Sequence, residues 1–217
     1  AADWEVEEDA SVMGGEWALR SEATVDEHVA FRQASIDLWG AAELLTFGDG
    51  RPGVVVGDGG WLFTDEEFKV YPDEDVEIAR KVELVTAVRD RIAGAGAVLV
   101  VAVIPSKARV EARHLGGVVV PVGARDRCDS FREALTARGV LAPDLETPMS
   151  AASAAGQDVF LRTDTHWTPH GAAVVASAIA AALPHELGVE TWVTTGGVEI
   201  QHEGDLLKYV PMGPWQH

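Results

Sequence analysis

The sequence predicts an α/β domain in which helices cover a mostly parallel central sheet. The clearest sign is residues 97–104, a continuous Val-rich run between a helical pattern and a proline, which is typical of a strand buried on both faces. Apolar residues at three- and four-residue spacing precede this run, and an Ala-rich helical segment follows Thr168 and Pro169. Strands and helices that alternate in this way favour a layered α/β fold with right-handed crossovers.

The N-terminal part of the chain predicts a helix and a hairpin. Residues 1–20 are acidic and irregular, and we expect them to form a leader ahead of one domain that spans residues 21–217. Helical apolar spacing over residues 21–45 ends in a glycine- and proline-rich stretch. Two short apolar strands at 54–56 and 61–63 then flank a turn with three glycines, which supply the positive φ that a tight hairpin requires.

Helix boundary signals define much of the remaining chain. The helix before the Val-rich run begins with acidic residues that suit the helix dipole, and Gly94 follows its last turn. Thr168 suits an N-cap, and Pro169 suits the first helical position. The expected elements are a helix over 73–93, a strand over 118–122, a helix near 129–138, a strand at 140–141, a helix over 169–183 and an antiparallel excursion over 192–200.

Composition excludes several classes of function. The chain has 217 residues with 17 basic and 35 acidic side chains, for a formal charge of −18. This balance argues against a nucleic-acid surface and against docking on an anionic membrane, since both need clustered lysine and arginine. No stretch reaches the roughly 20 apolar residues of a membrane span. The single cysteine, Cys128, cannot form an internal disulfide, and we expect a half-buried, inert thiol.

The densest polar cluster lies at residues 162–171, and its centre is Asp164 and His166. In extended backbone, residues two apart point to the same face, so both side chains can enter one cleft. Loops at the carboxyl ends of strands build the active sites of open α/β sheets. An imidazole beside a carboxylate there provides a general base and its orienting partner. The alternative is structural: Asp164 caps the helix, and His166 packs beside Trp167.

The other polar residues are candidates for metal ligands or for contacts to a glycan. Asp164, His166 and His170 are possible metal ligands, but the helix begins at Pro169, so the two histidines do not share a helical face. We therefore predict no metal and no cofactor. The remaining histidines considered, expected to be isolated and solvent-facing, are His114, His185 and His202. The basic residues near the predicted sheet end that could attract an anionic glycan are Lys107, Arg109, Arg113 and Arg162, with ordinary surface charges as the alternative. Trp167 could stack on a sugar ring, or it could belong to the core.

Several motifs, taken together, resemble one family. The segment 163–172, Thr-Asp-Thr-His-Trp-Thr-Pro-x-Gly-Ala, is similar to the hallmark of the alginate O-acetyltransferase family, the AlgX/AlgJ type of SGNH-hydrolase-like domain. Three further segments fit in the same order: Gly-Asp-Gly-Gly-Trp-Leu-Phe at 57–63, Pro-Ser-Lys-Ala-Arg at 105–109 and Gly-Asp-Leu-Leu at 204–207. Together these motifs cover roughly residues 50–215.

The resemblance implies a three-layer α/β/α fold in which Asp164 and His166 are the acid and base of a catalytic triad. It also implies a polysaccharide acceptor, a membrane-bound acetyl-donor protein and a periplasmic or exported location. The charge of −18 is unfavourable for binding a polyanion such as alginate, so the identity of the polymer stays open.

One family element is missing from the sequence. The family's nucleophilic serine belongs to a Gly-Thr-Ser-type segment downstream of the Asp-x-His motif, and nothing after His166 matches it. Ser177 fits a packing position in a helix, and Ser106 fits a turn or cap. We therefore expect the domain to be truncated at its C-terminus, inactive as it stands, and left with an unpaired sheet edge or a gap beside His166. The alternatives are an esterase of the same fold and a non-catalytic glycan-binding or assembly module.

Overall fold

The computed structural model describes residues 52–184, 197 and 202–210. Several sequence-based expectations fall on other residues: the leader over 1–20, the helix over 21–45, nearly all of the excursion over 192–200, and the environment of His185. These expectations lie outside the described residues, and so does the predicted boundary between leader and domain.

The predicted hairpin is confirmed. Strands β1 (Val54–Val56) and β2 (Leu62–Thr64) pair antiparallel, with Val55 opposite Phe63. In the turn between them, Gly59 has φ 63°, a left-handed conformation that favours glycine. Phe63 is fully buried, so the hairpin contributes directly to the core.

Two long helices pack together on one side of the domain. Helix α3 (Glu74–Gly94) lies within one residue of its predicted bounds at each end. Helix α5 (Val122–Ala137) contacts α3. This helix starts seven residues before its predicted position, at Val122, and residues 118–121 are not in a strand. The predicted strand over 118–122 is therefore wrong. Pro121 has φ −58°, which leads straight into the helix, and Val119 is 80% exposed.

The Val-rich run over 97–104 is extended, but the prediction of a strand buried on both faces is wrong. Its one ladder contact with the other described residues is a parallel bridge between Val100 and Leu141, and none of its eight residues is buried. Val101 and Val103, two residues apart, pack on the cluster that α3 and α5 form. Among the described residues, the run lacks a second strand neighbour that would bury its other positions.

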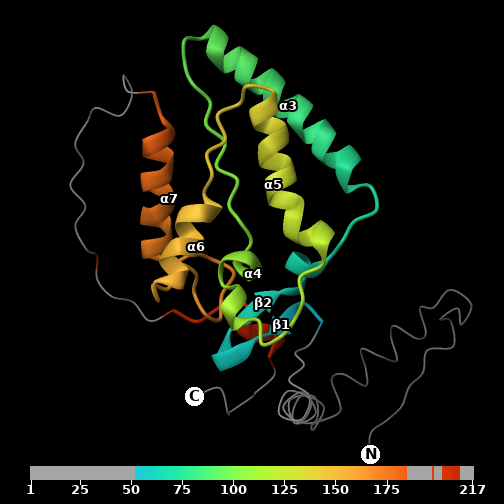
Figure 1. The fold of residues 1–217 in the computed structure, drawn as a ribbon, viewed down its shortest axis with the longest axis vertical. Coiled ribbons are helices and arrows are strands. Elements are labelled where there is room, and N and C mark those ends of the chain that lie inside the picture. The colour runs from blue at the N-terminus through green and yellow to red at the C-terminus, as the bar shows by residue number, and fades with distance from the viewer. Residues whose placement is uncertain (1–51, 185–196, 198–201, 211–217) are drawn as a thin grey trace, which may run out of the picture. The chain divides into compact units, whose positions relative to one another are not determined.

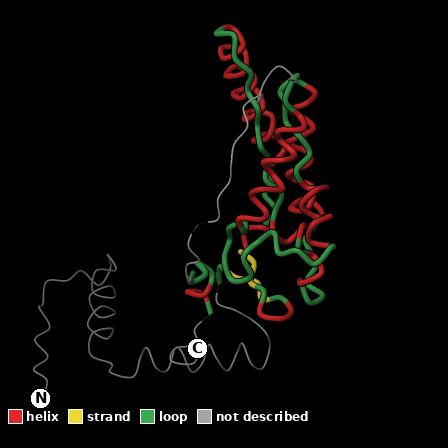
Figure 2. Tube along the Cα trace, turned by 90° about the vertical axis from the view of Figure 1, so that its left-hand side faces the viewer, coloured by secondary structure: helices red, strands yellow, loops and turns green. Residues whose placement is uncertain are grey.

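A second pair of helices completes the layered arrangement. Helix α6 (Glu146–Ala154) contacts α7 (Pro169–Ala182), which confirms the predicted helix after Thr168. The extended segments lie between this pair and the α3–α5 pair (Figure 1). Figure 2 shows β1 and β2 as a small element near one end of the helices. This order of layers matches the expected α/β/α arrangement, although the parallel pairing is confined to one bridge among the described residues.

The main core includes residues of the hairpin. It joins β2, the short helix α4 (Lys107–Val110), α6 and the segment that precedes α7. Its fully or almost fully buried members include Phe63, Leu145, Met149 and Val159. Helix α6, which supplies Met149, was not predicted. Its sequence contains Pro148 and several serines and alanines, so it shows no clear helical spacing of large apolar residues. No helix in the described part of the chain is long and apolar enough to cross a membrane.

Candidate active site

A tight loop before α7 holds Asp164 and His166. Backbone hydrogen bonds close it, from Leu161 N–H to the carbonyl of His166 (3.0 Å) and from Thr168 N–H to the carbonyl of Val159 (2.9 Å). The Thr168 hydroxyl also accepts from Gly171 N–H, which caps α7. The loop therefore connects rigidly to the helix that follows it.

Asp164 is a buried carboxylate with four donors. Its Oδ1 accepts from the backbone N–H of His166 (2.8 Å) and lies 2.7 Å from His166 Nδ1. Its Oδ2 lies 2.7 Å from His202 Nε2 and accepts from Asp205 N–H at 2.9 Å. Burial alone would raise the pKa of Asp164, but the bonds from His202, Asp205 and His166 outweigh it and hold that pKa well below the ordinary value. The group is thus ionised at neutral pH.

His166 presents its ring to solvent. Its side chain is 74% exposed, and its Nδ1 faces Asp164. The carboxylate, which only accepts, fixes the proton on Nδ1 and leaves the lone pair of Nε2 on the open side. Among the described residues, Nε2 has no hydrogen-bond partner. This arrangement is the one that a general base requires.

His202 corrects one sequence-based expectation. It was expected to be isolated, but it is a second imidazole on Asp164 and is about half exposed. The signal that could have found it is the neighbouring Gly204-Asp205 motif, because this segment docks on the loop of Asp164 and His166. Asp205 accepts from the N–H (2.9 Å) and the hydroxyl (2.6 Å) of Thr165. His114 is not isolated either, because its ring stacks on Trp61 with the ring centroids 4.3 Å apart.

Asp164, His166 and Asp205 place possible metal-ligand atoms within 4.8 Å of one another. Both carboxylates already accept hydrogen bonds from N–H or O–H donors at each of their oxygens. Hydrogen bonds between protein groups therefore explain why these three side chains lie together. His170, which was also weighed as a ligand, lies apart and contacts Gln157 at 3.1 Å.

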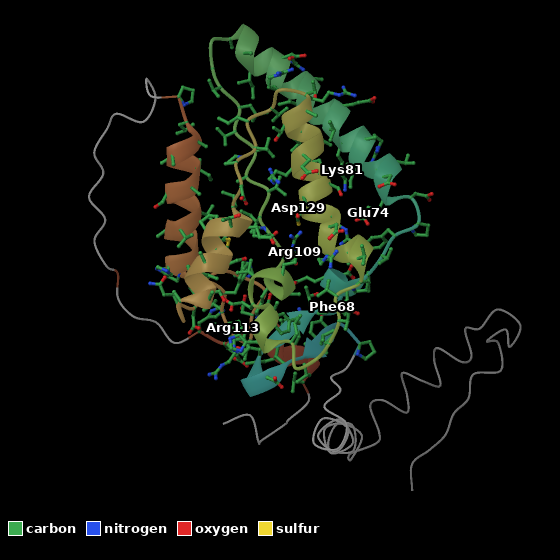
Figure 3. The ribbon with its side chains drawn as sticks, viewed as in Figure 1. Phe68, Glu74, Lys81, Arg109, Arg113 and Asp129 are labelled. Atoms are coloured by element: carbon green, nitrogen blue, oxygen red, sulfur yellow. The ribbon has the colours of Figure 1, made fainter. Side chains whose placement is uncertain are left out.

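Two residues expected to bind substrate have structural roles instead. Lys107 is only 2% exposed, and its ammonium group donates to backbone carbonyls. The side chain of Arg109 is 14% exposed and forms ion pairs with Asp129 on α5 (2.9 Å) and Glu146 on α6 (2.6 Å). Figure 3 labels Arg109 and Asp129 between the helices. Both basic groups are thus held by protein partners.

The other expected contacts lie differently. Arg162 is exposed, and its guanidinium reaches the carbonyl of Gly59 at 3.5 Å. Trp167 is partly buried against the main core, so most of its surface is used in packing. Arg113 pairs with buried Glu111 at 3.6 Å. Of the four basic residues expected near the site, Arg113 and Arg162 are the two that are exposed.

No serine among the described residues contacts His166. Ser177 donates to the carbonyl of Ala173 within α7. Ser106 precedes α4 at the N-cap position, and its buried hydroxyl has no partner. Cys128 is half-buried, and burial raises the pKa of its thiol, in keeping with the inert thiol that was expected.

A cavity of about 610 Å³ lies away from the Asp164–His166 loop, between α3 and α5. Its walls include Ile78, Val103 and Phe131. Glu74 and Lys81, which also line it, are labelled in Figure 3. None of the residues around Asp164 borders this cavity, so the cavity and the candidate site are separate.

Comparisons with known proteins point to one family of domains. The family model of the SGNH hydrolase-like domain, acetyltransferase AlgX, matches residues 54–217. The probable alginate O-acetylase AlgJ of Pseudomonas aeruginosa is 39% identical over 211 residues, 95% of this chain and 53% of that protein. The corresponding protein of Azotobacter vinelandii is 37% identical over 220 residues, 99% of this chain and 56% of that protein. The chain thus spans about half the length of these curated relatives.

A solved structure shows the same fold. The O-acetyltransferase domain of Pseudomonas putida AlgJ matches with a TM-score of 0.67 and 40% sequence identity. The match covers 74% of this chain and 59% of that one.

Proposed function

The chain belongs to the family of SGNH-hydrolase-like acetyltransferase domains typified by AlgX, and from this membership we propose that it serves the O-acetylation of an exported, alginate-like polysaccharide. The SGNH-like α/β fold expected from the motifs is confirmed. The acceptor, the acetyl donor and the catalytic roles below are all part of the proposal.

The observation that carries the proposal is the hydrogen bond between His166 Nδ1 and the buried carboxylate of Asp164. In the proposed reaction, His166 Nε2 takes the proton of a serine hydroxyl as its oxygen attacks the acetyl carbonyl. Backbone N–H groups stabilise the oxyanion, and the imidazolium returns the proton to the leaving group of the donor. A sugar hydroxyl then attacks the acyl-serine, His166 accepts the hydroxyl proton, and the same proton restores the serine.

The proposed nucleophile is a serine of the full-length protein, on a segment like the Gly-Thr-Ser stretch of the family that these 217 residues do not contain. Two observations support this assignment: no described serine contacts His166, and the exposed side of its ring is open to a further segment. Asp164 holds the imidazole tautomer and stabilises the imidazolium during both half-reactions.

The proposed acceptor site lies beside the loop. Arg162 is exposed and two residues from Asp164, so its guanidinium is placed to pair with the carboxylate of a uronic acid. Such a contact would offset the repulsion between a polyanion and a chain of charge −18. A membrane-bound protein is the proposed source of acetyl groups, in a periplasmic or exported setting.

An acceptor-dependence assay tests the proposed function. The full-length native protein carrying this sequence is incubated with a chromogenic acetyl ester, alone, with alginate oligosaccharides, or with neutral oligosaccharides. Transfer of acetyl groups to the alginate oligosaccharides is the expected result. Release of acetate alone would make the protein an esterase, and no turnover under any condition would favour a glycan-binding or assembly module.

A further inference from the structure

We propose that Lys107 is a positioning residue whose ammonium group fixes the loop that carries Asp164 and His166. Its role in the reaction rests on the proposed function, but its effect on the loop can be measured without turnover. The residue was expected to bind a glycan, and the structure gives it a different set of partners.

Lys107 gathers backbone carbonyls from two segments. Its Nζ lies 2.6 Å from the carbonyl oxygen of Leu62 on β2. It lies 2.7 Å from that of Leu161, 3.0 Å from that of Arg162 and 3.0 Å from that of Asp164. Three carbonyls within four residues of the loop therefore turn toward one cation, and this cation also ties the loop to the hairpin.

The surroundings of the ammonium group are those of a buried cation site. The rings of Trp61 and Phe63 lie 5.1 and 5.2 Å from Nζ, within the range of cation–π attraction. Among the described residues, no carboxylate forms a direct ion pair with Lys107. The acidic groups that act on it from farther away are Glu67, Glu111, Asp164 and Asp205.

Removal of the ammonium group would loosen the loop. The group has three N–H donors for these four carbonyls, whereas the side chain of Lys107→Met, of similar length, has none. The variant would therefore leave buried carbonyls unsatisfied. Burial lowers the pKa of Lys107 to about 8, so the wild-type group carries its charge at pH 6.5.

The lowered pKa makes a pH series unsuitable as the test. The pKa of Lys107 is below its ordinary value of 10.5, so the unfolded chain binds more protons between about pH 8 and 10.5. Deprotonation of Lys107 in the folded state therefore makes the free energy of unfolding rise with pH in that window. An opening of the loop that hydrates the ammonium group follows the same sign, so positioning is tested by substitution at one pH.

Amide hydrogen exchange on the full-length native protein tests the proposal. Exchange is followed at pH 6.5 in the wild type and in Lys107→Met, at the N–H groups of His166 and Asp205 that bond to Asp164. We expect their protection to be on the order of tenfold lower in Lys107→Met. Amides in the middle of α5, such as that of Leu135, serve as the internal control and should keep their protection.

Lys107→Arg supplies the matched variant, because its guanidinium keeps the charge and several N–H donors. Its protection at His166 and Asp205 should lie closer to the wild type than that of Lys107→Met, and Lys107→Met should lower kcat for acetyl transfer with little change in KM. Wild-type protection at both amides in Lys107→Met, or an equal fall at Leu135, overturns the proposal. If Lys107→Met does not fold, Lys107→Gln takes its place, and the exchange comparison decides even if acetyl transfer is absent.

Discussion

One carboxylate, Asp164, receives two imidazole groups, and the sequence alone pointed to one of them. His166 could be predicted because residues two apart share a face in extended backbone. His202 could not, because it reaches Asp164 from 38 positions away, through docking of the Gly204–Asp205 segment on the loop. Lys107 was expected to contact a glycan, and a sequence pattern does not reveal that this lysine is buried among backbone carbonyls.

The hydrogen bonds to Asp164 predict how acid acts on the fold. Its pKa is held below the ordinary carboxyl value, so its bonds stabilise the native state fully above about pH 4 and lose this effect as the pH falls further. The free energy of unfolding, measured by urea titration, should therefore decrease between about pH 5 and 2 in the wild type. Asp164→Asn should be less stable at pH 7 and show a shallower decrease. An equal slope in the two proteins would contradict this role of Asp164.

At the scale of elements, the sequence predicted an element correctly where residues of that element form its own turn or cap. The β1–β2 turn has its glycines, and α7 has its Thr168 cap and Pro169. Prediction failed where the outcome depends on distant neighbours. Residues 97–104 have the composition of a buried strand, but burial requires partners on both sides, and the described residues supply one bridge. The valines before Pro121 have strand propensity, yet the proline directs the chain into α5.

The cap of α7 predicts a measurable loss of stability. Thr168→Ala removes the acceptor for Gly171 N–H (3.0 Å) and the donor to the carbonyl of Asp158 (2.7 Å). We expect a loss of about 0.5–2 kcal/mol in the free energy of unfolding, measured by urea titration. Thr168→Ser keeps the hydroxyl and should stay close to the wild type. Equal losses in both variants would show that the methyl group, not the cap, is responsible.

The docking of the Gly204–Asp205 segment predicts an intolerant glycine. A Cβ at Gly204 would collide with the carbonyl oxygen of Thr163, so Gly204→Ala should push Asp205 N–H away from Asp164. We expect a loss of about 1–3 kcal/mol in stability together with reduced acetyl transfer.

Gly94→Ala is the matched control for this change. Gly94 is the last residue of α3 and has no neighbour within 4 Å of an added Cβ. It should tolerate alanine or gain about 0.5–1 kcal/mol. Thermal unfolding and the acetyl-transfer assay compare the two variants, and a Gly204→Ala protein that behaves like Gly94→Ala would contradict the close docking.

At the scale of the whole molecule, the candidate site lies where three parts of the fold meet. The hairpin, α4 and the loop before α7 are joined through Lys107. Helices α3 and α5 pack on the side of the extended segments opposite to α6 and α7 (Figure 1). The layered α/β class was predictable from the alternation of elements. The joining of these parts was not, because it depends on contacts between residues far apart in the sequence.

The most direct test of acetyl-transfer chemistry at this site compares two histidines. In the full-length native protein, kcat/KM for acetyl transfer from a chromogenic ester to alginate oligosaccharides is measured for the wild type, His166→Ala and His170→Ala. His170 lies on the neighbouring helix and contacts Gln157, outside the Asp164 network. Loss of the general base should reduce the rate of His166→Ala by roughly 10²–10⁴-fold, and His170→Ala should remain near the wild type. An active His166→Ala protein, or equal losses accompanied by metal dependence, would contradict the assignment of Asp164 and His166 as the acid–base pair.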